Sequence, residues 1–130
     1  MPAKPSGIAP HFLVADVARA AEYYRDRLGF EIGPYFQDPP VFVIVQREGA
    51  AIQLSRMEGG RGGSNRKWKD EAFDAYVWVA DVDRLHREVA AKQAAILQTP
   101  LLKEYGMKEM DVRDVDGYVI RFGEDIPTPR

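Results

Sequence analysis

Few side chains in this sequence could carry chemistry, and their types already limit the reactions available. The chain has two histidines, His11 and His86, and no cysteine. The lack of cysteine excludes disulfides, thiolate metal ligands and a cysteine nucleophile. His11 begins an apolar run, whereas His86 lies in a segment with helical spacing. A histidine beside an apolar run is more often structural than catalytic, so His11 needs a second argument before it becomes a candidate base.

The segment 57–73 is glycine-rich and basic, and it is the second place where chemistry could be sought. It contains Gly59, Gly60, Gly62 and Gly63. It lacks the Gly-Lys-Ser/Thr ending of a phosphate-binding loop. Two acids follow directly after its basic residues. The basic residues lie around Trp68 and are Arg61, Arg66, Lys67 and Lys69. The composition favours a linker, with a loop over a pocket as the second interpretation and nucleic-acid binding as a remote one.

The elements that must position these residues begin with a strand and a helix. The apolar run at 11–14 predicts the first strand. Asp16 is expected to cap the helix that follows, and Gly29 to end it in a left-handed turn. Three more segments rich in β-branched or aromatic residues predict strands, at 30–36, 41–47 and 50–56. The first part of the chain therefore has the order βαβββ.

The second part of the chain repeats this order. The tetrapeptide Val-Ala-Asp-Val occurs at 14–17 and again at 79–82, an offset of 79 − 14 = 65. A helix is expected after the second copy, followed by strands around 95–98, 106–113 and 118–123, with the turn Asp-Val-Asp-Gly at 114–117. We therefore expect one domain, 1–130, made of a first repeat at 10–56, a linker at 57–73 and a second repeat at 74–124.

Charge and hydropathy exclude several kinds of partner. The 18 basic and 20 acidic residues give a net charge of −2, which attracts neither nucleic acid nor an anionic membrane. No apolar run is long enough to span a bilayer, and residues 1–10 lack the apolar core of a secretory signal. We expect a cytoplasmic protein without nucleic-acid or membrane partners.

Together these features resemble the vicinal oxygen chelate superfamily, which includes glyoxalase I, bleomycin resistance proteins and extradiol dioxygenases. The resemblance covers almost the whole chain. It is carried by His11 with the Val-x-Asp at 14–16, by Tyr-Tyr-Arg-Asp-Arg-Leu-Gly-Phe at 23–30, and by Arg-Asp-Val-Asp-Gly-Tyr-Val-Ile-Arg-Phe at 113–122. Val115 departs from the proline usual in that last motif. The resemblance implies an α+β fold in which two βαβββ repeats form a curled mixed sheet around a pocket.

In the metal-dependent members of this superfamily, the ligands come from the first and last strands of each repeat. By the resemblance these positions fall on His11, Gln53, Tyr76 and Arg121. Only His11 is a good ligand, because a Gln carbonyl binds weakly, Tyr is uncommon and Arg repels a cation. A guanidinium about 4 Å from a divalent ion costs on the order of 8 kcal/mol at an effective dielectric of about 20. We therefore expect no metal and no other cofactor, and with His86 on a helix we do not expect the two-histidine iron site of an extradiol dioxygenase.

The same four residues, joined by Trp78, would present donors, acceptors, a cation and aromatic surface to a small molecule. This set suits an anionic or oxygen-rich ligand, since Arg121 can hold a carboxylate or phosphate with two parallel hydrogen bonds. The alternative is structural. In that interpretation Arg121 pairs with Glu109 or Asp111 on the neighbouring strand, and Tyr76 and Trp78 fill the core.

Two classes of function remain. The first is a metal-free protein of the bleomycin resistance type, which sequesters a small molecule in a pocket often formed across a homodimer. The second is a lyase, isomerase or dioxygenase of the same superfamily, with a metal held by atypical ligands or metal-free with His11 as general base. Small repeats with exposed sheet edges favour a homodimer in either case. In the last strand, alternation places Ile120 and Phe122 in the core and Arg121 on the pocket side, level with Gln53.

Overall fold

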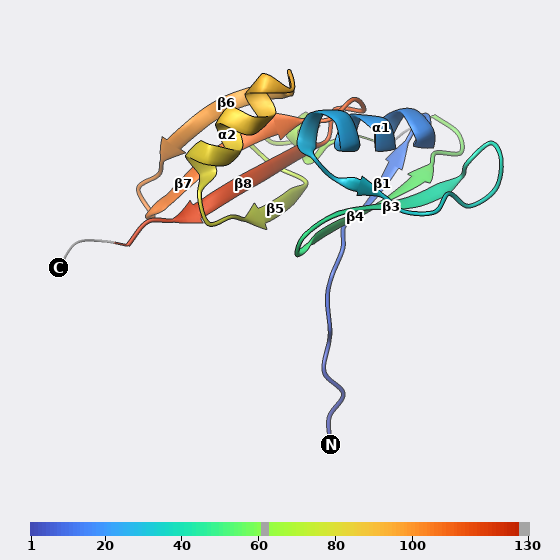
Figure 1. Ribbon diagram of the computed structural model, residues 1–130, viewed down its shortest axis with the longest axis horizontal. Helices are drawn as coiled ribbons and strands as arrows, with labels where there is room; N and C mark the ends of the chain where they lie inside the picture. Colours follow the sequence, from blue (N-terminus) through green and yellow to red (C-terminus); the bar gives the residue numbers. More distant parts are fainter. Residues whose placement is uncertain (61–62, 128–130) are drawn as a thin grey trace.

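The structure is a computed structural model that describes residues 1–60 and 63–127 (Figure 1). The first repeat consists of β1 (His11–Val14), α1 (Val17–Leu28), β2 (Glu31–Ile32), β3 (Phe42–Arg47) and β4 (Ala50–Arg56). A 3-10 turn, η1 (Asn65–Lys67), lies between the repeats. The second repeat consists of β5 (Ala75–Trp78), α2 (Val82–Ala91), β6 (Ala95–Leu102), β7 (Met107–Arg113) and β8 (Val119–Asp125). The predicted order βαβββ, twice, is confirmed.

Each repeat forms its own four-stranded mixed sheet. The strand orders are β1-β4-β3-β2 and β5-β8-β7-β6, so the two sheets have the same topology. In both, the first strand runs parallel to the last and the remaining neighbours are antiparallel. β1 and β5 each pair with one strand only, which leaves one backbone edge of each unpaired within the described residues.

The two helices begin in the same way, as the internal repeat predicts. The side chain of Asp16 accepts a hydrogen bond from the backbone N–H of Arg19, and that of Asp81 accepts one from Arg84. Each carboxylate satisfies a donor that the first helical turn leaves unpaired. α1 ends at Gly29, whose φ of 74° is the left-handed conformation expected there.

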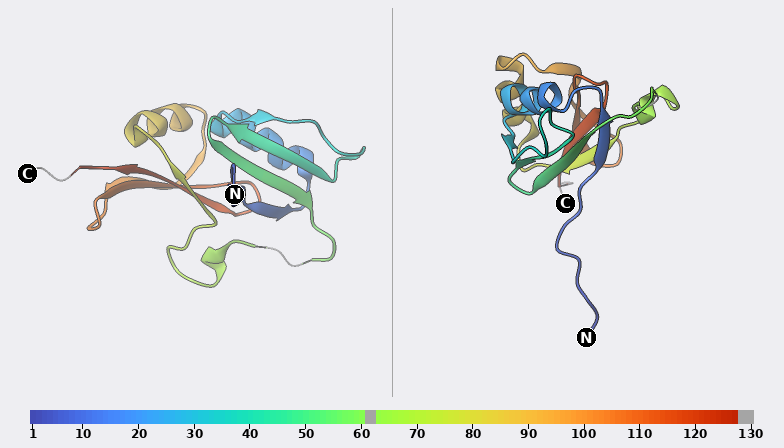
Figure 2. Two further views of the ribbon diagram at one scale, coloured as in Figure 1. Left: turned by 90° about the horizontal axis from the view of Figure 1, so that it is seen from below. Right: turned by 90° about the vertical axis from the view of Figure 1, so that its right-hand side faces the viewer.

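Both helices lie on the same side of the molecule, α1 over the first sheet and α2 over the second, and the N-terminal residues run away from the body (Figures 1 and 2). One buried apolar cluster lies beneath them and includes side chains from both repeats, such as Phe12, Leu54, Val89, Ile120 and Phe122. The opposite faces of the two sheets carry the polar and aromatic residues considered below.

The two repeats are joined through side chains as well as through the apolar cluster. The guanidinium of Arg47 on β3 makes two hydrogen bonds to the carboxylate of Glu88 on α2, of 2.6 and 2.9 Å. Arg47 also donates to the carbonyl of Leu28 at 2.9 Å. The ring of Phe12 stacks on that of Tyr118, with centroids 4.3 Å apart.

Two predicted strands have different bounds in the structure. The strand expected at 30–36 is reduced to Glu31–Ile32, because Pro34 has no N–H to continue the ladder; a single bridge joins Phe36 to Phe42. The strand expected at 95–98 extends to Leu102. It passes through Pro100, which an edge strand with shifted register tolerates.

The predicted linker 57–73 is not extended throughout. Ser64 accepts a hydrogen bond from the N–H of Arg66 and caps η1, and its hydroxyl donates to Asp74 at 2.5 Å. Residues 63–73 therefore fold into a compact turn beside the second sheet, as Figure 2 shows. Arg61 and Gly62, which also belong to this predicted linker, lie outside the described residues.

Candidate functional site

The first pair of predicted site residues lies on the sheet of the first repeat. His11 on β1 is directly opposite Gln53 on β4. Along β1, Phe12 and Val14 are buried and His11 and Leu13 are exposed, as alternation requires. Nε2 of His11 lies 2.8 Å from the hydroxyl of Ser55, on the same exposed face. His11, Gln53 and Ser55 therefore form a polar group without an acid or a permanent cation.

The second pair lies at the equivalent place in the second repeat. Tyr76 on β5 is directly opposite Arg121 on β8, the relationship that His11 has to Gln53. Trp78 follows on the same face of β5, and its ring centroid is 4.9 Å from that of Tyr76. Trp78 is 74% exposed, so it does not fill the core.

Arg121 is held by a carboxylate of the neighbouring strand. Its Nε donates to Oδ1 of Asp111 at 2.7 Å and its Nη2 donates to Oδ2 at 3.0 Å. Nη2 also donates to the carbonyl of Glu71, and the guanidinium lies over the ring of Phe73, 4.5 Å from its centroid. The sequence left open whether Arg121 pairs with an acid on the neighbouring strand, and the structure contains that pair. The Arg121 side chain is only 11% exposed.

Asp111 also accepts a hydrogen bond from the folded linker. Nη2 of Arg66 donates to Oδ2 of Asp111 at 2.7 Å, while Nε of Arg66 donates to the carbonyl of Ala72. Burial by itself would raise the pKa of the Asp111 carboxyl, but the hydrogen bonds from Arg121 and Arg66 hold that pKa below its usual range. Asp111 therefore stays ionised and fixes both guanidinium groups.

Glu109 is the second buried acid on this face, and two tyrosines bind it. Its side chain accepts hydrogen bonds from the hydroxyls of Tyr76, at 2.7 Å, and of Tyr105. Burial, with these bonds to a carboxylate, raises the pKa of Tyr105 to about 12 and raises the pKa of Tyr76 further. Both phenols therefore remain protonated donors near neutral pH, and neither can act as a base.

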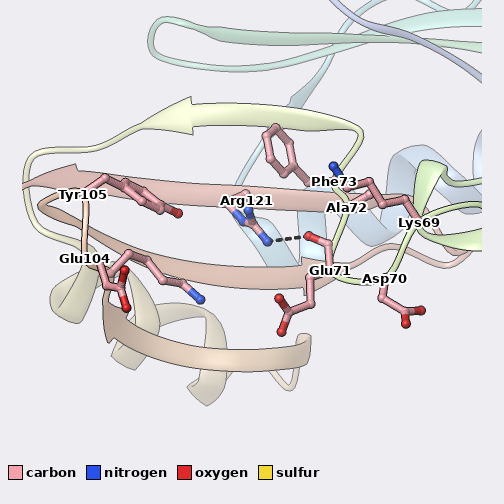
Figure 3. A pocket seen from close by; sticks show the side chains of 9 residues that line it. Lys69, Asp70, Glu71, Ala72, Phe73, Glu104, Tyr105 and Arg121 are labelled. Carbon is pink, nitrogen blue, oxygen red and sulfur yellow. Dashed lines mark hydrogen bonds between the residues drawn. The ribbon is translucent and has the colours of Figure 1, made fainter.

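Two hollows border these residues. A cleft of about 1010 Å³ lies between the repeats and is lined by residues from both, among them Ile8, Ala50, Ile52, Tyr76, Trp78 and Leu85. A smaller cavity of about 560 Å³ lies beside Arg121 and is lined by the folded linker and the β6–β7 turn (Figure 3). His11 and Gln53 line neither hollow, although their neighbours Pro10 and Ile52 line the cleft.

The four family positions thus form two pairs, one on each sheet. Their donor set does not suit a divalent ion, because Arg121 is a cation already bound to Asp111 and the Tyr76 phenol is held protonated by Glu109. Across residues 1–60 and 63–127, no group of three or more His, Cys, Asp or Glu side chains is arranged to hold a metal. His86 lies on α2, as expected from its spacing.

Sequence reasoning missed three residues of this face: Arg66, Phe73 and Tyr105. Glu109 and Asp111 were found because they alternate with apolar residues on a strand next to Arg121. The three missed residues lie in the folded linker and in a turn, where the sequence has no period that indicates direction. For Arg66 and Phe73, the one available signal was the presence of aromatic and basic residues in a segment otherwise rich in glycine.

Comparison with known proteins places this chain in a family. Residues 6–128 match the family model described as glyoxalase superfamily protein, and the chain belongs to that superfamily. A comparison with curated protein sequences finds no significant match. No helix in the described part of the chain has the length and apolar character needed to cross a membrane.

Several solved structures share the architecture. The bleomycin-binding protein from Streptomyces verticillus, complexed with copper(II)-bleomycin, is 26% identical, with 93% of this chain and 97% of that chain covered and a TM-score of 0.69. TioX from Micromonospora sp. ML1 is 21% identical, with 94% and 100% covered and a TM-score of 0.73. A glyoxalase-related enzyme from Clostridium phytofermentans is 16% identical, with 95% and 98% covered and a TM-score of 0.75.

Proposed function

We propose that this protein is a metal-free binding protein that sequesters a small organic molecule in the cytoplasm. The observation that carries the proposal is the exposed indole of Trp78, tilted against Tyr76 inside the cleft between the repeats. A large aromatic side chain left in water on a concave surface is typical of a place where a ligand packs. The bleomycin-binding protein from Streptomyces verticillus, which has the same fold, supports binding as the function.

The cleft has the lining that a flat, largely apolar ligand needs. Ile8, Ala50, Ile52 and Leu85 contribute aliphatic surface, and the indole offers a face for stacking. An offset aromatic pair is worth about 0.5–1.5 kcal/mol beyond the area that it buries. We propose that stacking on Trp78 provides affinity and that the polar residues beside Arg121 provide orientation.

The absence of a metal is part of the proposal and is supported by the donor set. At the four family positions, only His11 is a strong ligand, and its Nε2 is already close to Ser55. Arg121, bound to Asp111, occupies the equivalent of the Gln53 position with a fixed positive charge. Recruiting a divalent ion would require breaking that ion pair.

We also propose that two copies complete the binding site as a homodimer. The exposed sheet face of the first repeat carries Leu13 and Ile44, which are 44% and 39% exposed. It also carries His11 and Gln53, the half of the family site that lines neither hollow of the single chain. Covering this face with the second repeat of another copy would bring the two halves together. Light scattering at micromolar concentration should give twice 14.7 kDa, and a mass of one chain would contradict the dimer.

Binding in the cleft can be measured with Nile red, a neutral planar dye whose emission rises in apolar surroundings. The chain has two tryptophans, and Trp68 is 83% exposed on the folded linker, outside the cleft. Trp78→Ala should weaken dye binding by about tenfold, from lost stacking and lost apolar area. Trp68→Ala is the matched control and should leave the binding unchanged. Equal affinity in wild type and Trp78→Ala would refute the cleft as the binding site.

A second candidate function, metal-free catalysis with His11 as general base, is favoured by one contact. The 2.8 Å distance between Nε2 of His11 and Ser55 shows that the imidazole reaches a hydroxyl on its own sheet face. A base that abstracts protons from carbon acids would introduce deuterium into metabolites incubated with the protein in D2O. Mass spectrometry that finds incorporation with wild type and none with His11→Gln would support catalysis; equal labelling in both would refute it.

A further inference from the structure

The charged residues that line the smaller cavity beside Arg121 differ in how far they are buried. The two charged residues of its lining that are partly buried, Arg121 and Lys103, are both cations. The exposed charged residues of its lining are one cation, Lys69, and three acids, Asp70, Glu71 and Glu104. Figure 3 shows their carboxylates directed away from Arg121. Water screens charges at such a rim far more than charges at the bottom, so a ligand in the cavity experiences mainly the cations.

The Arg121 side chain is fixed by its hydrogen bonds, and its Nη1 remains available as a donor. Asp111 takes its Nε and one Nη2 hydrogen bond, and the carbonyl of Glu71 takes the other. Among residues 1–60 and 63–127, nothing accepts a hydrogen bond from its Nη1. A guanidinium fixed in this way is preorganised, because binding an acceptor requires no further ordering of its side chain.

The charges behind Arg121 balance without a ligand. Two guanidinium groups, Arg66 and Arg121, face two buried carboxylates, Asp111 and Glu109. This balance explains how the cation is buried, since an unpaired buried charge costs several kcal/mol. Lys103 is not part of that balance, and no described acid lies within ion-pair distance of it. It is therefore a partly buried cation of the lining that is free to bind an acid group.

Aromatic rings lie on two sides of the Arg121 guanidinium. Phe73 packs against the guanidinium, and Tyr105, tied to Glu109, turns its hydroxyl end toward Arg121 (Figure 3). Tyr105 is nonetheless 64% exposed, so its ring face is available for contact. Two aromatic rings beside the cations Arg121 and Lys103 suit a flat ligand that carries its negative charge at one end.

We propose that this cavity is a subsite for the acid group of a planar aromatic carboxylic acid. In it, Nη1 of Arg121 and the ammonium of Lys103 bind the carboxylate, and Phe73 and Tyr105 hold the ring. The inference rests on the proposed function, small-molecule binding, and adds to it the chemical class of the ligand and three residues, Lys103, Phe73 and Tyr105. Asp111 acts as a positioning residue, because it orients Arg121 without contacting the acid.

The experiment compares 2-naphthoate with 2-naphthamide, which has the same ring and shape but no charge. Protein NMR titration of the wild type should show 2-naphthoate binding about tenfold more tightly, as expected for a hydrogen bond between charged partners. The amide signal of Ala72, which lines the cavity, should shift, and ring protons of the probe should show contacts to Phe73 and Tyr105. Equal affinity for acid and amide, or shifts confined to the cleft, would overturn the subsite.

Variants test the two cations separately. Arg121→Met should remove the preference for the acid. It leaves two buried carboxylates with one guanidinium, Arg66, so the variant should also be less stable, and urea unfolding checks that it is folded. Lys103→Met should weaken 2-naphthoate binding by roughly threefold, the scale of a partly exposed ion pair. Lys67→Met removes the same charge from a lysine outside the cavity and should change nothing. If Arg121→Met does not fold, the acid–amide comparison on wild type and Lys103→Met decides alone.

Failure of this inference can be told apart from failure of the proposed function. Nile red reports on the cleft through Trp78, whereas 2-naphthoate reports on the cavity beside Arg121. Dye binding that depends on Trp78, with no preference for the acid probe, would overturn the subsite and leave small-molecule binding standing. Loss of both would overturn both.

Discussion

The hydroxyl of Tyr24 donates a 2.6 Å hydrogen bond to Oδ2 of Asp114, and this contact joins helix α1 of the first repeat to the β7–β8 turn of the second. Oδ1 of Asp114 accepts the N–H groups of Asp116 and Tyr118, which closes the turn itself. Asp116 in turn accepts the N–H of Ala15, just after β1. The Asp-Val-Asp-Gly motif that indicated the family from sequence is thus also a connector between the repeats.

Tyr24→Phe should destabilise the protein by about 1–3 kcal/mol, because Tyr24 is fully buried and its loss leaves one oxygen of Asp114 without its donor. The free energy of unfolding in urea gives the measurement. Tyr35→Phe removes a hydroxyl from a ring that is 42% exposed and serves as the control. A Tyr24→Phe protein as stable as the control would show that the bond contributes nothing.

Asp114 should make the protein less stable as the pH rises from about 4 to about 7. Burial raises the pKa of its carboxyl to about 6, although three donated hydrogen bonds oppose the shift. Between the usual pKa of an aspartate, about 3.9, and this value, the folded state binds the proton and the unfolded chain has lost it, so stability falls with increasing pH. The difference between these two pKa values corresponds to roughly 3 kcal/mol of stability across the window.

Asp111 acts in the opposite sense, since its lowered pKa adds stability that is lost as the pH falls below about 4. The test is therefore the difference between wild type and Asp114→Asn in urea unfolding at several pH values. This difference should change most between pH 4 and 6. A difference independent of pH would mean that Asp114 titrates as in the unfolded chain.

Much of the fold could be predicted because its signals are local. Asp16, Asp81 and Gly29 are recognisable capping residues, and β4 lies where its apolar pattern predicts, at Ala50–Arg56. The offset of 65 residues placed Tyr76 as the counterpart of His11, and the strand registers agree. The predicted strand after α1 was too long because a Gly-Pro pair interrupts it, a break that composition alone understated.

The site was harder to predict because it depends on segments far apart in the chain. Periodicity shows which face of β8 Arg121 occupies, but it does not show that Arg66, from the linker, reaches Asp111. It also does not show that the two family pairs lie on separate sheets, which depends on how the repeats pack. These features follow from long-range packing, for which a single sequence carries no period.

Incubation with Zn²⁺, Ni²⁺ or Fe²⁺ should leave less than one equivalent of metal on the protein after desalting. His11 is the one strong ligand at the family positions, and an Arg121 cation bound to Asp111 repels a second cation. Elemental analysis by mass spectrometry gives the ratio, and His11→Ala shows whether any residual metal depends on this histidine. One retained equivalent that disappears in His11→Ala would contradict a metal-free site.

Gly123→Ala should displace the ring of Tyr76 in the proposed binding face without removing any polar or aromatic side chain from that face. Gly123 lies opposite Trp78 in the β5–β8 pairing, and a Cβ there would overlap the hydroxyl and the ring of Tyr76. The ring has to rotate away and give up its hydrogen bond to Glu109, which is 2% exposed and would keep only one tyrosine donor. We expect a loss of about 1–3 kcal/mol in stability from this overpacking.

The same substitution should also weaken Nile red binding, because Tyr76 supports the indole of Trp78 at 4.9 Å. Gly7→Ala is the control, since Gly7 does not line the cleft and a Cβ at that position meets no atom within 4 Å. Urea unfolding and dye titration of the two variants provide the comparison. If Gly123→Ala behaves like Gly7→Ala in both measurements, Tyr76 does not occupy the place beside Gly123 that the proposed binding face requires.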